Sequence, residues 1–233
     1  MSFTYESIMP WGRSFDEYRR MFNLSEHDLQ LNILGCGDGP ASFNAEMRAR
    51  GGRVVSCDPL YQFSAGQIRE RIEATYGNVV EQARRNRDKF VWDVIRSPEE
   101  MGQIRMQAMH AFLVDYEMGN QDGRYVCGES PSLPFTAGAF DLALCSHFLF
   151  LYTDNLSLDF HHQAIADLLR IAAEVRIFPL LTYNAEPSPY LGPVCARLET
   201  MGYEISIEQV PYEFQQGGNK LLRIRPKNNQ KSL

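Results

Sequence analysis

The chain has 233 residues, a formal net charge of −6, 44% hydrophobic residues and 22% charged residues. This length suits one large domain, and the composition is that of an ordinary folded protein, which excludes a disordered chain, a fibre and a low-complexity protein. The negative charge argues against a general nucleic-acid-binding protein, which would present a basic face, although a local basic patch stays open.

The cysteines and the N-terminus indicate the compartment. The five cysteines are odd in number and none has CxxC spacing, so we expect neither a disulfide framework nor a zinc site. Residues 1–10 lack the basic start and apolar core of a signal peptide, and no apolar run approaches the roughly 20 residues of a membrane span. We therefore expect a reduced, cytoplasmic protein without a metal or a membrane partner.

The first half of the chain predicts a βαβ unit. A strand over residues 31–34 leads into the glycine-rich turn Gly35–Gly39, and Pro40 suits the first turn of the next helix because its missing N–H costs nothing there. A second strand over residues 53–57 is closed by Asp58. This order of strand, glycine turn, helix and strand is typical of a parallel sheet.

Capping boxes and apolar stripes predict helices around this unit. Ser14 with Glu17 and Ser64 with Gln67 fit capping boxes. In each pair, the side chain of either residue accepts a hydrogen bond from the free backbone N–H of the other. The helical stretch over residues 61–123 is far longer than an ordinary crossover, so we expect a helical insert there. The helix that follows Ser14 predicts a helical cap over residues 1–30.

The second half of the chain predicts further alternation of strands and helices, without a linker or a repeat. We therefore expect one α/β domain over residues 1–233. The two final strands are close in sequence and are expected to pair as a hairpin. The predicted strands cover residues 125–127, 141–145, 174–178, 203–210 and 220–224, and the predicted helices cover 158–172 and a segment that ends at Gly202.

The turn after the first strand and the acid after the second suggest a nucleotide site. Glycines in Gly35–Gly39 let the backbone turn sharply and come close to a ligand, but Pro40 breaks the dinucleotide fingerprint GxGxxG. Asp58, nineteen residues after Gly39, can accept hydrogen bonds from both hydroxyls of a ribose. The alternative is a plain turn residue beside Pro59.

A third motif makes the combination resemble a known family. Gly128–Ser130 is followed by Leu133–Phe135 and by Phe140-Asp141. With the glycine turn and Asp58, this pattern resembles the class I S-adenosylmethionine-dependent methyltransferases over about residues 31–226. The resemblance implies a doubly wound, mainly parallel seven-stranded sheet with an antiparallel C-terminal strand, in a three-layer sandwich. It also implies S-adenosylmethionine as the cofactor and an unidentified, small-molecule acceptor.

The resemblance also implies a role for each motif. Asp58 would hold the ribose, Leu60 or Tyr61 would pack on the adenine, and Glu129 would face the adenine amino group. Ser146 and His147 would face the methyl group, with His147 as the catalytic base because its unperturbed pKa is about 6.5. A hydrogen-bonded histidine at a strand end is the alternative. The predicted cofactor-binding residues are Gly35, Cys36, Gly37, Asp38, Gly39, Asp58, Pro59, Leu60, Glu129, Ser130, Ser146 and Arg13.

Two residue groups near the predicted site carry open alternatives. Arg13 can pair with a carboxylate by a two-pronged hydrogen bond, or it can be solvated. Tyr183, Asn184 and Tyr190, with the helical insert, are candidates for the acceptor pocket, and half-buried packing is the alternative.

Departures from the family pattern keep other functions open. Ile33 stands where the family often has an acid that helps to hold the cofactor's amino group. A catalytically silent S-adenosylmethionine-binding or protein-interaction module is therefore one alternative. An NAD(P)-dependent oxidoreductase is another, disfavoured by Pro40 and by the paired final strands. Nucleic-acid contact through the basic segments Arg84–Arg87 and Arg223–Lys231 is a minor alternative, and the oligomeric state stays open.

Overall fold

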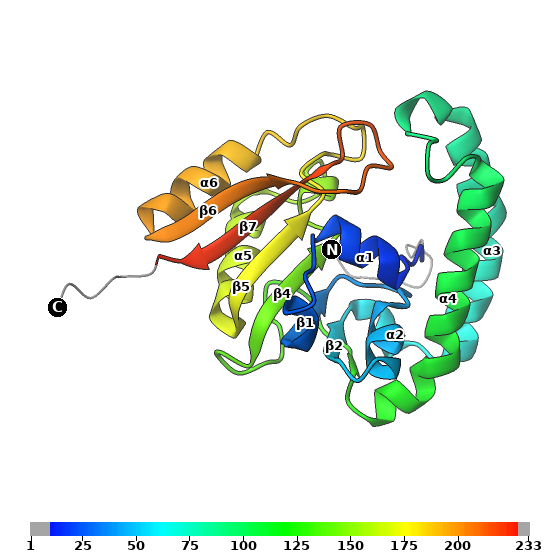
Figure 1. Ribbon diagram of the computed structural model, residues 1–233, viewed down its shortest axis with the longest axis horizontal. Helices are drawn as coiled ribbons and strands as arrows, with labels where there is room; N and C mark the ends of the chain where they lie inside the picture. Colours follow the sequence, from blue (N-terminus) through cyan, green and yellow to red (C-terminus); the bar gives the residue numbers. More distant parts are fainter. Residues whose placement is uncertain (1–9, 228–233) are drawn as a thin grey trace.

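The computed structural model describes residues 10–227; residues 1–9, screened for an export signal, and residues 228–233, the end of the basic tail, lie outside the described residues. Figure 1 shows a twisted sheet with helices on both faces and a long pair of helices at one flank. The strands are β1 (Asn32–Cys36), β2 (Arg53–Cys57), β3 (Tyr125–Val126), β4 (Phe140–Ser146), β5 (Ala172–Phe178), β6 (Tyr203–Gln209) and β7 (Lys220–Pro226).

Most of the helices that the sequence predicts are present in the structure. The capping boxes of Ser14 with Glu17 and of Ser64 with Gln67 are both formed. None of the described helices is long and apolar enough to cross a membrane. The helices are α1 (Phe15–Met21), α2 (Phe43–Ala49), α3 (Ala65–Arg85), α4 (Pro98–Gln121), α5 (Leu158–Ile171) and α6 (Leu191–Thr200), with short 3₁₀ turns η2 (Asp28–Gln30), η3 (Pro59–Gln62), η4 (Arg87–Lys89) and η5 (Phe150–Tyr152).

The sheet has the predicted class I methyltransferase arrangement. Its strand order is β3-β2-β1-β4-β5-β7-β6, and β7 runs antiparallel to both of its neighbours while the other pairs are parallel. The chain starts at β1, moves outward to β3 and then returns to place β4 on the other side of β1. This change of direction is a topological switch point, and ligands of such sheets bind beyond the carboxyl ends of the strands there.

Alternating side chains of β4 divide the core into two layers. Leu142 and Leu144 face the layer that contains α1 and α2, while Ala143 and Cys145 face the layer that contains α5 and α6. A third cluster lies between α3, α4 and the β3 edge, and its aromatic rings all contact one another: Tyr61, Phe112, Tyr116 and Tyr125. The sheet is therefore covered on both faces, as a parallel sheet requires.

The prediction that Pro40 opens a helix was wrong. Helix α2 begins at Phe43, with Ser42 at the N-cap, so Pro40 stays in the turn. The reason is tertiary, because the N-terminal segment packs on this turn: a Cβ on Gly12 would lie 2.1 Å from the Pro40 carbonyl oxygen. The Ser42 N–H also donates to the Arg13 carbonyl at 3.0 Å, which holds the chain away from the helical path before residue 43.

The connection between α3 and α4 is paired with the loop between β6 and β7. Phe90 and Gln215 form an antiparallel bridge, and the rings of Phe90 and Phe214 stack with their centroids 4.8 Å apart. The two segments are far apart in sequence but adjacent in Figure 1. They close one end of the molecule over the carboxyl ends of β4 and β5.

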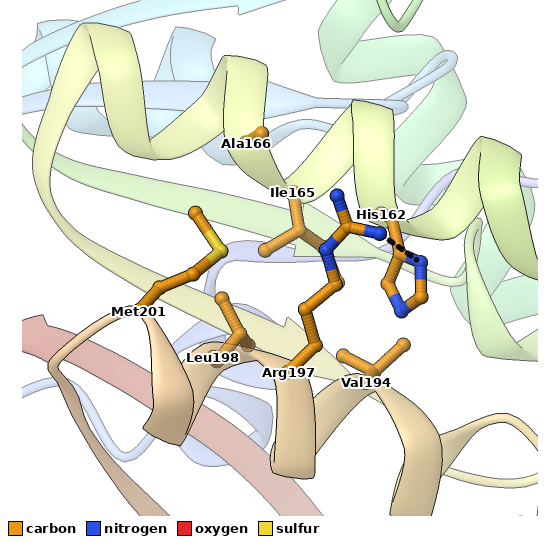
Figure 2. Close-up of a pocket in the computed structure, with 7 residues that line it drawn as sticks. All are labelled: His162, Ile165, Ala166, Val194, Arg197, Leu198 and Met201. Carbon is orange, nitrogen blue, oxygen red and sulfur yellow. Dashed lines mark hydrogen bonds between the residues drawn. The ribbon is translucent and has the colours of Figure 1, made fainter.

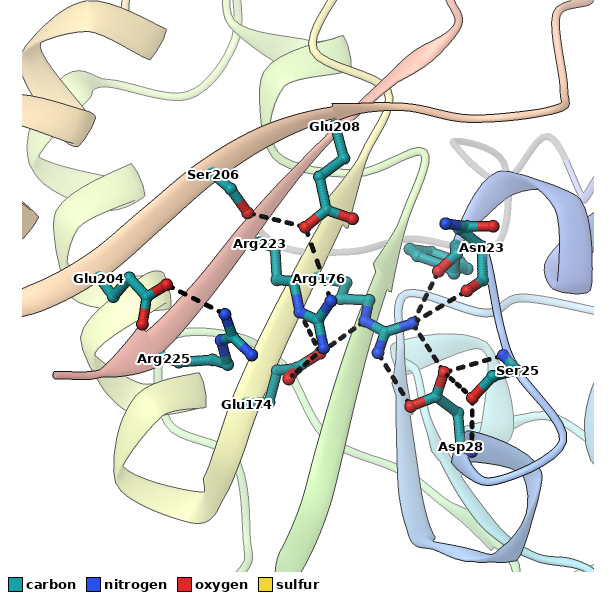
Figure 3. A network of polar contacts seen from close by, with 11 residues as sticks. Asn23, Ser25, Asp28, Glu174, Arg176, Glu204, Ser206, Glu208, Arg223 and Arg225 are labelled. Atoms are coloured by element: carbon teal, nitrogen blue, oxygen red, sulfur yellow. Dashed lines mark hydrogen bonds and ion pairs between the residues drawn. The ribbon is translucent and has the colours of Figure 1, made fainter. Parts of the chain in front are cut away.

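A polar network fastens the start of the chain to the middle of the sheet. Arg176 on β5 donates from Nη2 to Asp28 Oδ1 at 2.9 Å, from Nε to Glu174 Oε1 at 2.6 Å and from Nη1 to the Phe22 carbonyl at 2.8 Å (Figure 3). The side chain of Arg176 is almost completely buried. Its hydrogen bonds offset the cost of removing a charge from water.

Candidate functional site

The glycine turn after β1 lies at the topological switch point and is joined to the start of η3. Gly37 and Gly39 have positive φ angles of 71° and 53°, which favour glycine. Apart from the two chain neighbours of Gly39, no atom of residues 10–227 lies within 4 Å of the point where a Cβ on Gly39 would stand, so this part of the turn faces open space. The backbone at Gly39 can therefore be approached closely by a ligand.

Asp58 joins the ends of β1 and β2. Its Oδ2 accepts from the Gly39 N–H at 2.9 Å and its Oδ1 accepts from the Leu60 N–H at 2.8 Å. Burial raises the pKa of the Asp58 carboxyl above its usual range, while these two backbone bonds lower it. A carboxylate has about four lone-pair sites, so the oxygens keep acceptor capacity for the two hydroxyls of a ribose.

Asp38 points away from this open side and into the core. The Tyr18 hydroxyl donates to Asp38 Oδ1 at 2.7 Å, and the Ser56 hydroxyl donates to Oδ2 at 2.6 Å. Burial raises the pKa of Asp38 to about 6. A Cβ on Gly35 would lie 1.8 Å from Asp38 Oδ2, so the missing side chain of Gly35 makes room for this carboxyl group.

Strand β1 has Ile33 where the family often has an acid, and the position of Asp38 is relevant to this difference. Ile33 and Gly35 are two residues apart on one strand and therefore face the same side of the sheet. Because the Asp38 carboxyl group lies against Gly35, the turn brings a carboxyl group to the face on which the strand itself offers only Ile33. Sequence spacing alone does not reveal this, since Asp38 lies beyond the end of the strand.

The remaining residues predicted for the cofactor lie around the same edge in different environments. Glu129 is exposed, whereas Ser130 is buried and its Oγ has no hydrogen-bond partner among the described residues. Leu60 is buried, and so is Tyr61, whose hydroxyl donates to the Gly39 carbonyl at 2.8 Å. Cys36 is a buried free thiol, and Pro59 opens η3 after Asp58. The roles expected for these residues stay predictions.

His147 follows β4 in a strained backbone conformation. Its φ is 49°, its N–H donates to the Phe178 carbonyl at 2.7 Å, and its Nδ1 lies 3.0 Å from Ser146 Oγ. A positive φ at a non-glycine residue is often found at functional sites. Burial and the nearby cations of Arg13 and Arg105 lower the pKa of His147 well below its usual value, so the ring is neutral at physiological pH and is a weaker base than a free imidazole.

A cavity of about 200 Å³ opens beside His147. The N-terminal segment, α3, the α3–α4 connection, the ends of β4 and β5, and the β6–β7 loop all contribute to its wall. Tyr183, a predicted pocket residue, lines it and is 63% exposed. Asn184 and Tyr190 are not among its lining residues; the Tyr190 ring packs on His161.

A buried ion pair next to this cavity was missed in the sequence. Arg105 donates to Glu17, and the Tyr212 hydroxyl donates to the other Glu17 oxygen at 2.9 Å. The three residues come from α4, α1 and the β6–β7 loop, so they join the elements that enclose the cavity. One signal was present: Arg105 occupies an apolar position of the helical stripe that runs through Met101, Ala108 and Phe112.

A second, smaller hollow lies between α5 and α6, away from these residues (Figure 2). Its volume is about 30 Å³, which is enough for about one or two water molecules. Arg197 Nη1 lies 3.2 Å from His162 Nδ1 across it. The neighbouring His161 is buried, with its ring nitrogens on the carbonyls of Ser157 and Leu149. Both histidines therefore contact other groups of the protein, away from the candidate site.

Comparison with known proteins adds one close relative and several loosely similar structures. No family model matches the chain. The chain is 34% identical over 215 residues to the uncharacterized protein MJ0045 of Methanocaldococcus jannaschii, covering 92% of this chain and 94% of that protein.

The similar solved structures include a SAM-dependent methyltransferase from Aquifex aeolicus, with 15% identity and a TM-score of 0.41 over 89% of this chain and 90% of that one. Another is the magnesium protoporphyrin IX methyltransferase of Synechocystis PCC 6803 with bound SAM, with 11% identity and a TM-score of 0.44 over 91% and 90% of the two chains.

Proposed function

Since the chain belongs to the family of the uncharacterized Methanocaldococcus jannaschii protein MJ0045, we propose its function from its own site: it is an S-adenosylmethionine-dependent methyltransferase. The cofactor binds at the carboxyl ends of β1, β2 and β4, and a small-molecule acceptor binds in the adjoining cavity. One domain carries both sites.

The contact between Asp58 and Gly39 carries this proposal. The acid after β2 and the glycine turn after β1 are the two parts expected for a nucleoside site, and a 2.9 Å hydrogen bond joins them. The antiparallel β6–β7 hairpin favours a methyltransferase over an NAD(P)-dependent oxidoreductase. The solved structures with similar folds include methyltransferases with SAM or SAH bound, which agrees with this choice of cofactor.

The residues around the turn fit the cofactor. The free lone pairs of Asp58 suit ribose hydroxyls, and the open side of Gly39 admits the ligand. The Ser130 Oγ, which has no partner within residues 10–227, offers a polar contact. When bound, S-adenosylmethionine supplies an activated methyl group. The protein then needs to align the acceptor with that group, which can account for much of the rate enhancement. We infer that His147, a neutral side chain that lines the cavity, is the group that accepts a proton from an acceptor that must lose one.

Calorimetric titration of the full chain with S-adenosylmethionine, S-adenosylhomocysteine and NAD(H) tests the proposal. We expect the two sulfur compounds to bind and Asp58→Ala to abolish that binding. Asp154→Ala, which removes an exposed acid outside the site, is the matched control and should bind as the wild type does. Absence of binding, or preference for NAD(H), would contradict the proposal.

Binding without methyl transfer to any acceptor would instead indicate a silent binding module.

A further inference from the structure

We propose that the acceptor is a small, mostly apolar carboxylate whose anionic group binds to Arg13 in the cavity beside His147. This inference rests on the proposed function and deepens it by naming the chemical class of the acceptor. It also reassigns Arg13, which the sequence analysis placed among the cofactor residues.

The hydrogen bonding of Arg13 is incomplete. Its Nη1 donates to the Trp11 carbonyl at 2.8 Å, and its Nε is buried without a partner in the described part of the chain. No carboxylate of residues 10–227 lies within ion-pair distance of its guanidinium group. Since arginine carries five donors in a planar fork, Arg13 keeps donors that match the two oxygens of a carboxylate.

The charges around Arg13 leave an excess of positive charge. Arg105 is neutralised by Glu17, with which it forms a buried ion pair. Burial and the repulsion from Arg105 lower the pKa of Arg13, whereas Glu17 opposes this effect only in part. His147 is neutral and contributes no charge at physiological pH. Arg13 is half-buried, with its Nε removed from water. Because a charge that is partly removed from water without a counter-charge is costly, an anion in the cavity would be favoured.

The charged side chains in the cavity wall are also positive. Arg13 and Lys89 are its lining cations, and no aspartate or glutamate is found among the described residues that line it. The rest of the wall is largely apolar or aromatic, with Trp11, Phe178 and Phe214 among its members. Such a wall fits a molecule with an apolar body and one anionic end.

The volume of the cavity indicates how large a part of the molecule it can enclose. A cavity of about 150 Å³ can hold benzene, so one of about 200 Å³ has room for a single ring with a short substituent. A carboxylate on such a body can reach Arg13 while another part of it faces His147, since both residues line the same space.

Apart from Arg13 itself, the residues that line the cavity are not those of the predicted cofactor site, so the proposed role of Arg13 is distinct from cofactor binding. None of the residues of the glycine turn lines the cavity, and neither does Asp58. The backbone of Arg13 nevertheless contacts the segment that joins the turn to α2, because its carbonyl accepts from the Ser42 N–H at 3.0 Å. The backbone of Arg13 thus holds this segment, while its side chain lines the cavity.

Titration of the full chain with matched pairs of probes tests the inference. Benzoate, phenylacetate and hexanoate are each compared with the corresponding amide, in the presence and in the absence of S-adenosylhomocysteine. We expect at least one carboxylate to bind about tenfold or more tightly than its amide, as a charge-assisted hydrogen-bonded pair would give.

Variants of the cavity cations sharpen the test. Arg13→Gln should weaken carboxylate binding by about tenfold or more, Arg13→Lys should weaken it less because the charge remains, and both should bind S-adenosylhomocysteine as the wild type does. Arg96→Gln, which changes an exposed arginine outside the cavity, is the matched control. Unchanged melting temperatures would confirm that the variants are folded.

Three outcomes would overturn the inference. If Arg13→Gln weakens S-adenosylhomocysteine binding as strongly as carboxylate binding, Arg13 is a cofactor residue. If the carboxylates do not bind, or bind no better than their amides, the acceptor is not an anion of this class, while binding of S-adenosylhomocysteine would leave the proposed function standing. Failure of S-adenosylhomocysteine to bind to the wild type would contradict the proposed function itself.

Discussion

Two arginines that lie near opposite ends of α1 differ in their surroundings: Arg176 is buried, whereas Arg13 is half-buried. Arg176 lies near the C-terminal end, where Asp28, Glu174 and the Phe22 carbonyl all accept hydrogen bonds from its side chain (Figure 3). Arg13 precedes the N-terminal end, where its only hydrogen bond from the side chain to another described residue goes to the Trp11 carbonyl. A buried arginine with its donors occupied stabilises the fold, whereas one that keeps donors beside a cavity is able to bind a ligand.

The largest expected effect comes from the pair that borders the cavity. Glu17→Gln keeps the shape of the side chain but leaves Arg105 without its counter-charge, next to the already uncompensated Arg13. We expect a loss of about 4 kcal/mol in the free energy of unfolding at pH 7, measured by urea denaturation. Glu26→Gln, which alters an exposed pair with Arg19, should change it by less than about 1 kcal/mol.

The pH dependence of this loss has a defined sign. Because Arg105 holds the pKa of Glu17 below its usual value in the folded protein, the stabilisation is present above the unfolded-state pKa of about 4.3 and is lost as the pH falls below it. The difference between the wild type and Glu17→Gln should therefore shrink below about pH 4. A constant difference down to about pH 2 would show that shape, and not charge, explains the effect.

Arg176→Met should be the next most damaging change. It leaves Asp28 and Glu174 in their partly buried positions without their shared partner, so we expect a loss of about 3 kcal/mol in the free energy of unfolding. Binding of S-adenosylhomocysteine and of carboxylates by the folded variant should be unchanged. A selective loss of ligand binding without a loss of stability would break the comparison between the two arginines.

Asp38→Asn should stabilise the protein at neutral pH. The folded-state pKa of about 6 lies above the unfolded value of about 3.9, so the stability that the protonated acid contributes is present below about pH 4 and is lost as the pH rises through 6. An amide avoids the cost of ionising this buried group, and we expect a gain of about 3 kcal/mol at pH 8 that vanishes near pH 4. Urea denaturation at both pH values measures it, and a gain of equal size at both would contradict the assignment.

The smallest effect on stability is expected at Arg13. Arg13→Gln removes one hydrogen bond but also an uncompensated, half-buried cation, so the free energy of unfolding should change by less than about 1 kcal/mol. The same change should raise the pKa of His147 toward its usual value, because a cation that lowers it is removed. NMR titration of the His147 ring measures this shift, and an unchanged pKa would show that the two groups do not interact.

Local sequence signals predicted most of the fold. The capping boxes at Ser14 and Ser64 identified two helix starts, because their hydrogen bonds form within four residues of chain. The pairing of β6 with β7 was likewise predictable from the short connection between them. The start of α2 was not, since contact with Gly12 and Arg13 keeps Pro40 in the turn.

In the candidate site, too, some features could be predicted from the sequence and others could not. Asp58 and the glycine turn could be selected from their positions after two successive strands. The inward direction of Asp38 could not, because it depends on Tyr18 and Ser56 from other elements. The cavity itself could not be predicted either, since its wall comes from six separate parts of the chain.

The sequence by itself determined the order of the strands and helices and the residues at the carboxyl ends of β1 and β2, because short-range hydrogen bonding and the periodicity of apolar residues specify these features. Only the tertiary structure decided which charges are compensated. Glu17 neutralises Arg105 from 88 positions away, and Arg13, only four positions from Glu17, keeps free donors in the cavity wall. Charge compensation depends on distances in space after packing, which no local pattern encodes.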